Sequence, residues 1–276
     1  MNTPSEDRKK TWLLRTNSPT PASRNSTVSR STSTRSTNAP TSFLTVRPST
    51  SCRCRSATSC GWYSRRWTSV RVIVVRAIGE HFSSGGNIGG FMEATPETVS
   101  KLAWNIASPA RCAKPVIVAN RGYCFGVGFE LSLACDFRIA SDSAQYALPE
   151  QKLGQIPGSG GSARLQKMIG ITRTKDIVMR SKRIPARQAL EWGIVTECVA
   201  DKDLEATTDK LVDELRSFAP LAQRTAKKLL NDTEDSTLAI AIELEGHCYS
   251  RLRQSEDFKE GVQAFNAKRP PRFVGR

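Results

Sequence analysis

The chain has 276 residues, enough to bury a full-sized core in one or two domains, and a formal net charge of +15. The charge is uneven: residues 1–70 hold 12 Lys and Arg against 2 Asp and Glu, whereas residues 71–276 hold 29 against 24. The globular part is therefore only mildly basic, so we expect no nucleic-acid partner. No apolar run reaches the roughly 20 residues of a membrane span, so we expect no membrane partner.

Residues 1–70 contain 15 Ser, 13 Thr and 10 Arg and show no helical or strand period. Three interpretations remain open for this low-complexity segment: a disordered tail, an organellar transit peptide, or a stretch read out of frame. Its cysteines, Cys52, Cys54 and Cys60, have no partner pair or histidine at zinc-site spacing, and we expect no metal.

Globular sequence begins at residue 71. The apolar run Val72–Val75 predicts a strand covered on both faces. A loop rich in glycine and serine follows over residues 79–87. Thr95 and Pro96 then predict the N-cap and first residue of a helix that runs to about Ser108.

Residues 115–161 carry most of the chemical signal. Apolar runs predict strands at 116–119, 137–140 and 145–148, and a helix at 129–134 after three glycines in seven residues. Two carboxylates, Glu130 and Glu150, lie in segments that otherwise favour burial. Such a pair can divide acid and base roles.

The rest of the chain is mostly helical. A glycine cluster at 158–161 precedes a helix that Gly170 ends, and a second helix follows from Thr172 to Arg180. Further predicted elements are a helix at 185–193, a strand at 194–199, and helices at 203–218, 221–230, 237–252 and 257–265. We therefore expect an α/β core at 71–200 and a helical region at 201–276.

The remaining cysteines and the two histidines restrict the chemistry. Five cysteines after residue 100 are odd in number and lie in apolar or helical settings, which indicates reduced thiols and a cytoplasmic protein. His81 and His247 are the two histidines of the sequence, so a Ser-His-Asp triad is not favoured. We expect His81 to be a loop or packing residue.

Three motifs resemble the enoyl-CoA hydratase/isomerase (crotonase) family in order and spacing: GEHFSSGGNI, KPVIVANRGYCFGVGFELSLACDFRIAS and YALPEQKLGQIPGSGGSARL. The resemblance covers residues 71–276. It implies a spiral of β-β-α turns, a helical C-terminal trimerisation region, and a coenzyme A thioester as the substrate. It further implies a homotrimer or a dimer of trimers.

The resemblance also implies roles for individual residues. The N–H groups of Ser84 and Val127 would bind the thioester oxygen as it gains negative charge. Glu130 and Glu150 would hold one water, one activating it for attack at C3 and the other delivering a proton to C2. Further substrate contacts fall on the two glycine loops and the C-terminus: Phe82, Gly85, Gly86, Asn87, Gly126, Lys268 and Phe273.

Some positions depart from the family pattern. Val127 stands where the family more often has Gly, and Asn87 where Asp is common, although an amide can still cap the next segment. Residues 1–70 show nothing that matches the strand pair and helix with which family members begin.

The expected function is that of a lyase, an enoyl-CoA hydratase of fatty-acid β-oxidation, which needs no cofactor because coenzyme A is part of the substrate. Two alternatives remain. One is another acyl-CoA reaction on the same scaffold, such as isomerisation or ring-opening hydrolysis in aromatic-acid breakdown. The other is a non-catalytic binding protein, for instance one that binds RNA through the Arg-rich tail.

Overall fold

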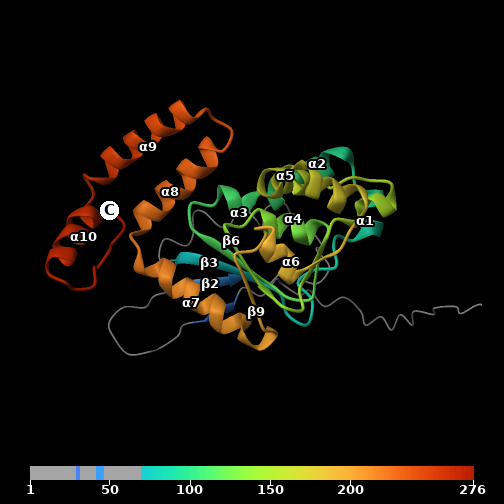
Figure 1. Cartoon of the computed structure of the whole chain (residues 1–276), viewed down its shortest axis with the longest axis horizontal. Coiled ribbons are helices and arrows are strands. Elements are labelled where there is room, and N and C mark those ends of the chain that lie inside the picture. The colour runs from blue at the N-terminus through green and yellow to red at the C-terminus, as the bar shows by residue number, and fades with distance from the viewer. Residues whose placement is uncertain (1–28, 32–41, 47–69) are drawn as a thin grey trace, which may run out of the picture.

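The computed structural model of the chain describes residues 29–31, 42–46 and 70–276 (Figure 1). Its larger sheet has the strand order β1-β2-β3-β4-β6-β9, in which β1 and β2 are antiparallel and the other neighbours are parallel. These strands are β1 Ser29–Ser31, β2 Ser42–Val46, β3 Val70–Arg76, β4 Val116–Asn120, β6 Phe137–Ser141 and β9 Glu197–Val199.

Alternate residues of the central strands face two separate cores, as the period of a strand requires. Val72 and Val74 of β3 belong to a cluster with Leu204 and Val212 of helix α7 (Leu204–Ser217), which covers one face of the sheet. The intervening β3 residues pack into a larger cluster on the opposite face. The predicted fully covered strand at Val72–Val75 is therefore confirmed.

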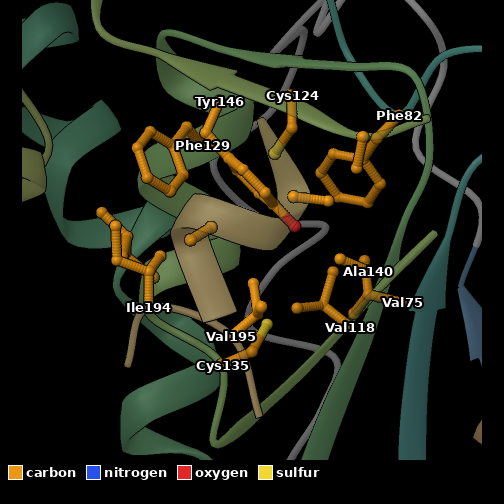
Figure 2. Close-up of a cluster of buried hydrophobic side chains, with 14 of the residues drawn as sticks. Val75, Phe82, Val118, Cys124, Phe129, Cys135, Ala140, Tyr146, Ile194 and Val195 are labelled. Carbon is orange, nitrogen blue, oxygen red and sulfur yellow. The ribbon is translucent and has the colours of Figure 1, made fainter. Parts of the chain in front are cut away.

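The larger cluster includes apolar side chains from the segment 115–161, among them Phe129 and Tyr146. Figure 2 shows Phe82, Phe129 and Tyr146 gathered there with Val75 and Val118. All five side chains are almost fully buried. A polar group inside this core is satisfied locally, since the Tyr146 hydroxyl donates to the Asn120 side-chain oxygen at 3.2 Å.

A second sheet of three short strands lies against this core. It has the order β5-β7-β8, and its strands are β5 Tyr123–Phe125, β7 Gln145–Ala147 and β8 Ile184–Pro185. Ser83 forms an isolated parallel bridge to Cys124 of β5. The loop that follows β3 is thereby attached to the strand that follows β4.

The helices begin and end close to the predicted positions. Thr95 caps α2 (Pro96–Ile106) by accepting from the Thr98 N–H at 3.3 Å. Helix α5 (Gly161–Met179) is interrupted at Gly170, whose φ of 78° and ψ of 165° are not helical. This confirms the predicted break, because a positive φ is accessible to glycine at little cost.

The other helices complete the chain. They are α1 Ile88–Glu93, α3 Ser108–Arg111, α4 Val127–Leu133, α6 Ala186–Glu191, α8 Pro220–Thr233, α9 Leu238–Leu252 and α10 Glu256–Asn266, with 3-10 helices at Pro149–Leu153 and Asp201–Asp203. In Figure 1, α8, α9 and α10 extend away from the sheet. Helix α9 has no buried residue, and apolar side chains such as Leu238, Ile240 and Ile242 are exposed on it.

Two features differ from the sequence-based expectation. We found no strand pair in residues 1–70, yet the structure has β1 and β2 there; strands of 3 and 5 residues are too short to show a clear period. The helix predicted to run to about Ser108 ends at Ile106, and the separate short helix α3 follows it, with Pro109 in the first turn, where a missing N–H costs nothing. The rest of residues 1–69, including Cys52, Cys54 and Cys60, lies outside the described residues.

Across the described ranges, none of the helices combines the length and the apolarity that crossing a bilayer would require. The five cysteines within these ranges are all free, and Cys112, Cys124 and Cys135 are buried, which confirms the prediction of reduced thiols. His81 is a packing residue, as expected: its ring stacks on Tyr123 at 4.1 Å between centroids, and its Nδ1 accepts from the Tyr123 N–H at 3.3 Å.

Candidate active site

The candidate site lies where the chain leaves the carboxyl ends of two neighbouring parallel strands, β3 and β4. The chain runs from β3 into the loop with Ser83 to Gly86, and from β4 through β5 to Gly126 and α4. Ser83 links the two segments, since its N–H donates to the Tyr123 carbonyl at 2.8 Å and its own carbonyl accepts from the Phe125 N–H at 3.0 Å. In open parallel sheets this edge is where ligands bind.

Glycines allow these segments to approach closely. A Cβ on Gly128 would overlap the Cβ of Ser83, and one on Gly126 would lie 3.7 Å from the Gly85 Cα and 3.1 Å from Glu150 Oε1. Gly126 also has a φ of 53°, so a side chain there would be strained as well as crowded. Glycine at positions 126 and 128 therefore lets this part of the chain approach the loop after β3 closely.

The two predicted oxyanion donors belong to these segments. Ser84 is exposed in the loop after β3, and Val127 is the first residue of α4. The first N–H groups of a helix have no carbonyl partner within the helix. Their use as a pair remains a prediction, and the close approach of Gly85 to Gly126 places their chain segments side by side.

Glu130 is buried one helical turn into α4, with 3% of its surface exposed. Its Oε1 accepts from the Ser159 N–H at 2.7 Å and from the Gly161 N–H at 3.1 Å. Burial raises the pKa of Glu130, while these two N–H groups and the nearby Arg164 charge oppose the rise. The carboxylate is thus held by the turn that opens α5.

Glu150 lies in the 3-10 helix Pro149–Leu153 and is only partly buried. Its Oε2 is nevertheless shielded and has no hydrogen-bond partner within the described part of the chain. Burial raises the pKa of Glu150 to about 7, and the Glu130 charge adds to the rise. The two carboxyl groups are therefore close enough for the charge of Glu130 to affect the pKa of Glu150.

The geometry around the loop refines three of the predicted contacts. Phe82 is fully buried in the core, so its side chain supports the loop from beneath. A Cβ on Gly86 would meet the Phe91 ring at 2.5 Å, so α1 covers this glycine. Asn87 occupies the N-cap position of α1, but its side chain makes no capping hydrogen bond, and our expectation of an amide cap is wrong.

Lys268 and Phe273 lie with the C-terminal helices. Phe273 packs near Gly261 of α10, and its carbonyl accepts from the Arg71 guanidinium. Figure 1 shows α10 and the C-terminus far from α4, so this chain does not bring Lys268 and Phe273 to its own glutamates. Their contact with coenzyme A stays a prediction.

Sequence reasoning did not identify the groups that hold Glu130. The cluster Gly158–Gly161 signalled only the start of a helix, whereas the structure uses the N–H groups of Ser159 and Gly161 as donors to the carboxylate. The available signal was the glycine at 160, which adopts a φ of 94°. A turn of this kind directs successive N–H groups at an anion.

Comparison with known proteins identifies the family of this chain. The model of the enoyl-CoA hydratase/isomerase family matches residues 63–276. The chain belongs to this family. Its fold resembles that of an enoyl-CoA hydratase from Bacillus anthracis, with a TM-score of 0.80 and 29% identity over 90% of this chain and 99% of that one. An enoyl-CoA hydratase subunit I from Geobacillus kaustophilus HTA426 gives a TM-score of 0.78 and 32% identity over 91% and 100%.

The expected crotonase fold is therefore confirmed. Among curated proteins, a carnitinyl-CoA dehydratase from Salmonella typhi is 40% identical over 172 residues, which are 59% of this chain and 64% of that protein. The match thus spans less than two thirds of the relative's length. The chain thus shares the sequence pattern and the fold of the enoyl-CoA hydratase/isomerase family over most of its length.

Proposed function

We propose that the chain is an enoyl-CoA hydratase, adding water across the 2,3 double bond of an enoyl-CoA thioester. The observation that carries this proposal is the pair Glu130 and Glu150, which interact electrostatically yet have different surroundings. Two carboxyl groups with pKa values pushed apart can act as base and acid at the same pH. A single carboxylate would suffice for moving a double bond.

The surroundings assign the two roles. Two backbone N–H groups and the Arg164 charge oppose the burial that raises the pKa of Glu130, so we assign it the role of the base, which accepts a proton from water as the oxygen attacks C3. Glu150 has a shielded oxygen without a partner and a pKa near 7, so it holds a proton for C2. The N–H groups of Ser84 and Val127 stabilise the enolate oxygen between these steps.

The same residues run the reaction backwards. In dehydration of a 3-hydroxyacyl-CoA, Glu150 removes the C2 proton and Glu130 protonates the departing hydroxyl. The similarity to a carnitinyl-CoA dehydratase makes a 3-hydroxyacyl-CoA with a cationic chain a second candidate substrate. Neither direction as proposed uses a cofactor.

The proposal is tested by the loss of ultraviolet absorbance as crotonyl-CoA is hydrated. We expect Glu130→Gln and Glu150→Gln each to lower kcat by about 10²- to 10⁴-fold, because each removes one proton-transfer group. Full-length protein that leaves crotonyl-CoA unchanged but isomerises a 3-enoyl-CoA would refute the proposal in favour of an isomerase. Salt-dependent RNA binding that needs residues 1–70 would favour a binding protein.

We further propose that the active protein is a homotrimer or a dimer of trimers. The support is the exposed apolar surface of α9 and the distance of the C-terminal helices from the sheet. Light scattering of the purified chain measures the assembly directly, and a monomer at micromolar concentration would contradict it.

A further inference from the structure

The turn that holds Glu130 is itself held by a second side chain. Ser159 contributes to both contacts: its N–H donates to Glu130 Oε1 at 2.7 Å, and its carbonyl accepts from Arg164 Nη1 at 3.2 Å. The glutamate and the guanidinium therefore bond to the same peptide residue through its two polar groups. A movement of either Glu130 or Arg164 would therefore displace Ser159, to which the other side chain is bonded.

Gly160 lies at the centre of this arrangement. A Cβ there would overlap Arg164 Nη1, so the guanidinium occupies the space that a side chain at residue 160 would fill. On the other side, a Cβ on Gly161 would lie 3.0 Å from Glu130 Cγ. The turn is thus packed between the carboxylate and the guanidinium, so a substituent on Gly160 would displace the guanidinium and one on Gly161 would press on Glu130.

We propose that Arg164 is a positioning residue of the site: it fixes the turn Ser159–Gly161 against Glu130 and supplies the positive charge that compensates that buried carboxylate. This inference rests on the proposed function, because it assumes that Glu130 works as the ionised base. Arginine suits the task because its planar guanidinium stays charged and offers several donors in a fixed plane.

Other charged and titratable groups near Glu130 and Arg164 also affect the pKa values that a titration would measure. Glu150 faces Glu130 from the 3-10 helix, Glu234 at the end of α8 acts on Arg164, and the buried Cys135 thiol lies near the guanidinium. Arg164 is the one cation among the causes that affect the pKa of Glu130. Its removal therefore leaves only hydrogen bonds, from the N–H groups of the turn and the Ser159 side chain, to oppose the effect of burial on the pKa of Glu130.

The test compares Arg164→Gln, which removes the charge, with Arg164→Lys, which keeps it, and with Lys175→Gln, which removes an exposed charge further along α5. For hydration of crotonyl-CoA, we expect Arg164→Gln to lower kcat about 10- to 100-fold with little change in KM. We also expect the acidic limb of the kcat/KM profile to move to higher pH. Arg164→Lys should restore the limb, and Lys175→Gln should match the wild type.

A second measurement is independent of activity. Titration of ¹³C-labelled glutamate carboxyls by NMR, with the Glu130 signal assigned through Glu130→Gln, should show a higher pKa for Glu130 in Arg164→Gln than in the wild type or in Arg164→Lys. An unchanged Glu130 titration in folded Arg164→Gln would overturn the inference. An equal shift in both Arg164 variants would overturn it too, since charge would then not be the cause. A wild type inactive on enoyl-CoA substrates would refute the proposed function alone, because this titration would still report on Arg164.

Discussion

Replacing Glu150 with glutamine should stabilise the protein at neutral pH while removing its activity. The pKa of Glu150 is raised from 4.5 to about 7, so ionising it costs the folded state free energy. One pKa unit corresponds to about 1.4 kcal/mol, which gives about 3 kcal/mol for a fully shielded group. Because Glu150 is partly exposed, solvent screening reduces this to about 1–2 kcal/mol. Glutamine keeps the shape and removes the charge.

The pH dependence has a definite sign. Below pH 4.5 Glu150 is protonated in both the folded and the unfolded state, so the wild type and Glu150→Gln should be equally stable. Between pH 4.5 and 7 the unfolded state ionises first, and the wild type should lose stability relative to the variant until the difference levels off above pH 7.

The assay is thermal unfolding at pH 5 and pH 8 at one protein concentration, because assembly makes the midpoint concentration-dependent. At pH 8 we expect the Tm of Glu150→Gln to be higher by about 2–8 °C, and at pH 5 by less. Exposed Glu93→Gln is the matched control and should show no such trend. A Tm difference that is constant from pH 5 to pH 8, or a variant less stable than the wild type at pH 8, would refute the reasoning.

Three further predictions follow from the described contacts. Hydration should lose kcat/KM above about pH 7, as Glu150 gives up its proton, and dehydration by the same enzyme should lose it in parallel, because the net reaction takes up no proton and both directions need one proton on the glutamate pair; a kcat/KM for hydration that stays level well above pH 7 would contradict the role assigned to Glu150. Lys227→Met should lower the free energy of unfolding by about 3–5 kcal/mol, measured by urea titration, because the nearly buried Lys227 donates to Asp136 at 2.7 Å and its loss leaves that carboxylate without its cation. Gly128→Ala should lower kcat about 100-fold by displacing Ser83, and adding Ser83→Gly should restore part of it; a fully active single variant would show that the contact does not set the loop.

Much of the fold followed from local pattern. The strand at Val72–Val75, the cap at Thr95 and the helix break at Gly170 each depend on a few neighbouring residues, and the structure confirms all three. Propensity and capping act over one or two turns, so they are visible in the sequence. The strands β1 and β2 were not, since β2 joins the sheet by pairing with β3, which is distant in the sequence, and β1 joins it through β2.

The groups of the candidate site also differ in whether the sequence reveals them. Glu130 and Glu150 stood out because a carboxylate in an apolar segment is unusual in any fold. The donors Ser159 and Gly161 could not be found, because a backbone N–H has no residue type and its direction depends on the turn. The missing cap at Asn87 shows the converse case, in which a suitable residue type at the right position does not form the bond.

The asymmetry of the two glutamates does not come from depth of burial. Glu130 is the more buried of the two, and burial alone would make it the stronger candidate for a protonated acid. It is instead the carboxylate that receives two N–H donors at 2.7 and 3.1 Å, whereas a shielded oxygen of Glu150 receives none. The chain thus separates base from acid by where it places backbone donors. It follows that reshaping the turn Ser159–Gly161 should change the chemistry more than changing the residues that surround Glu150.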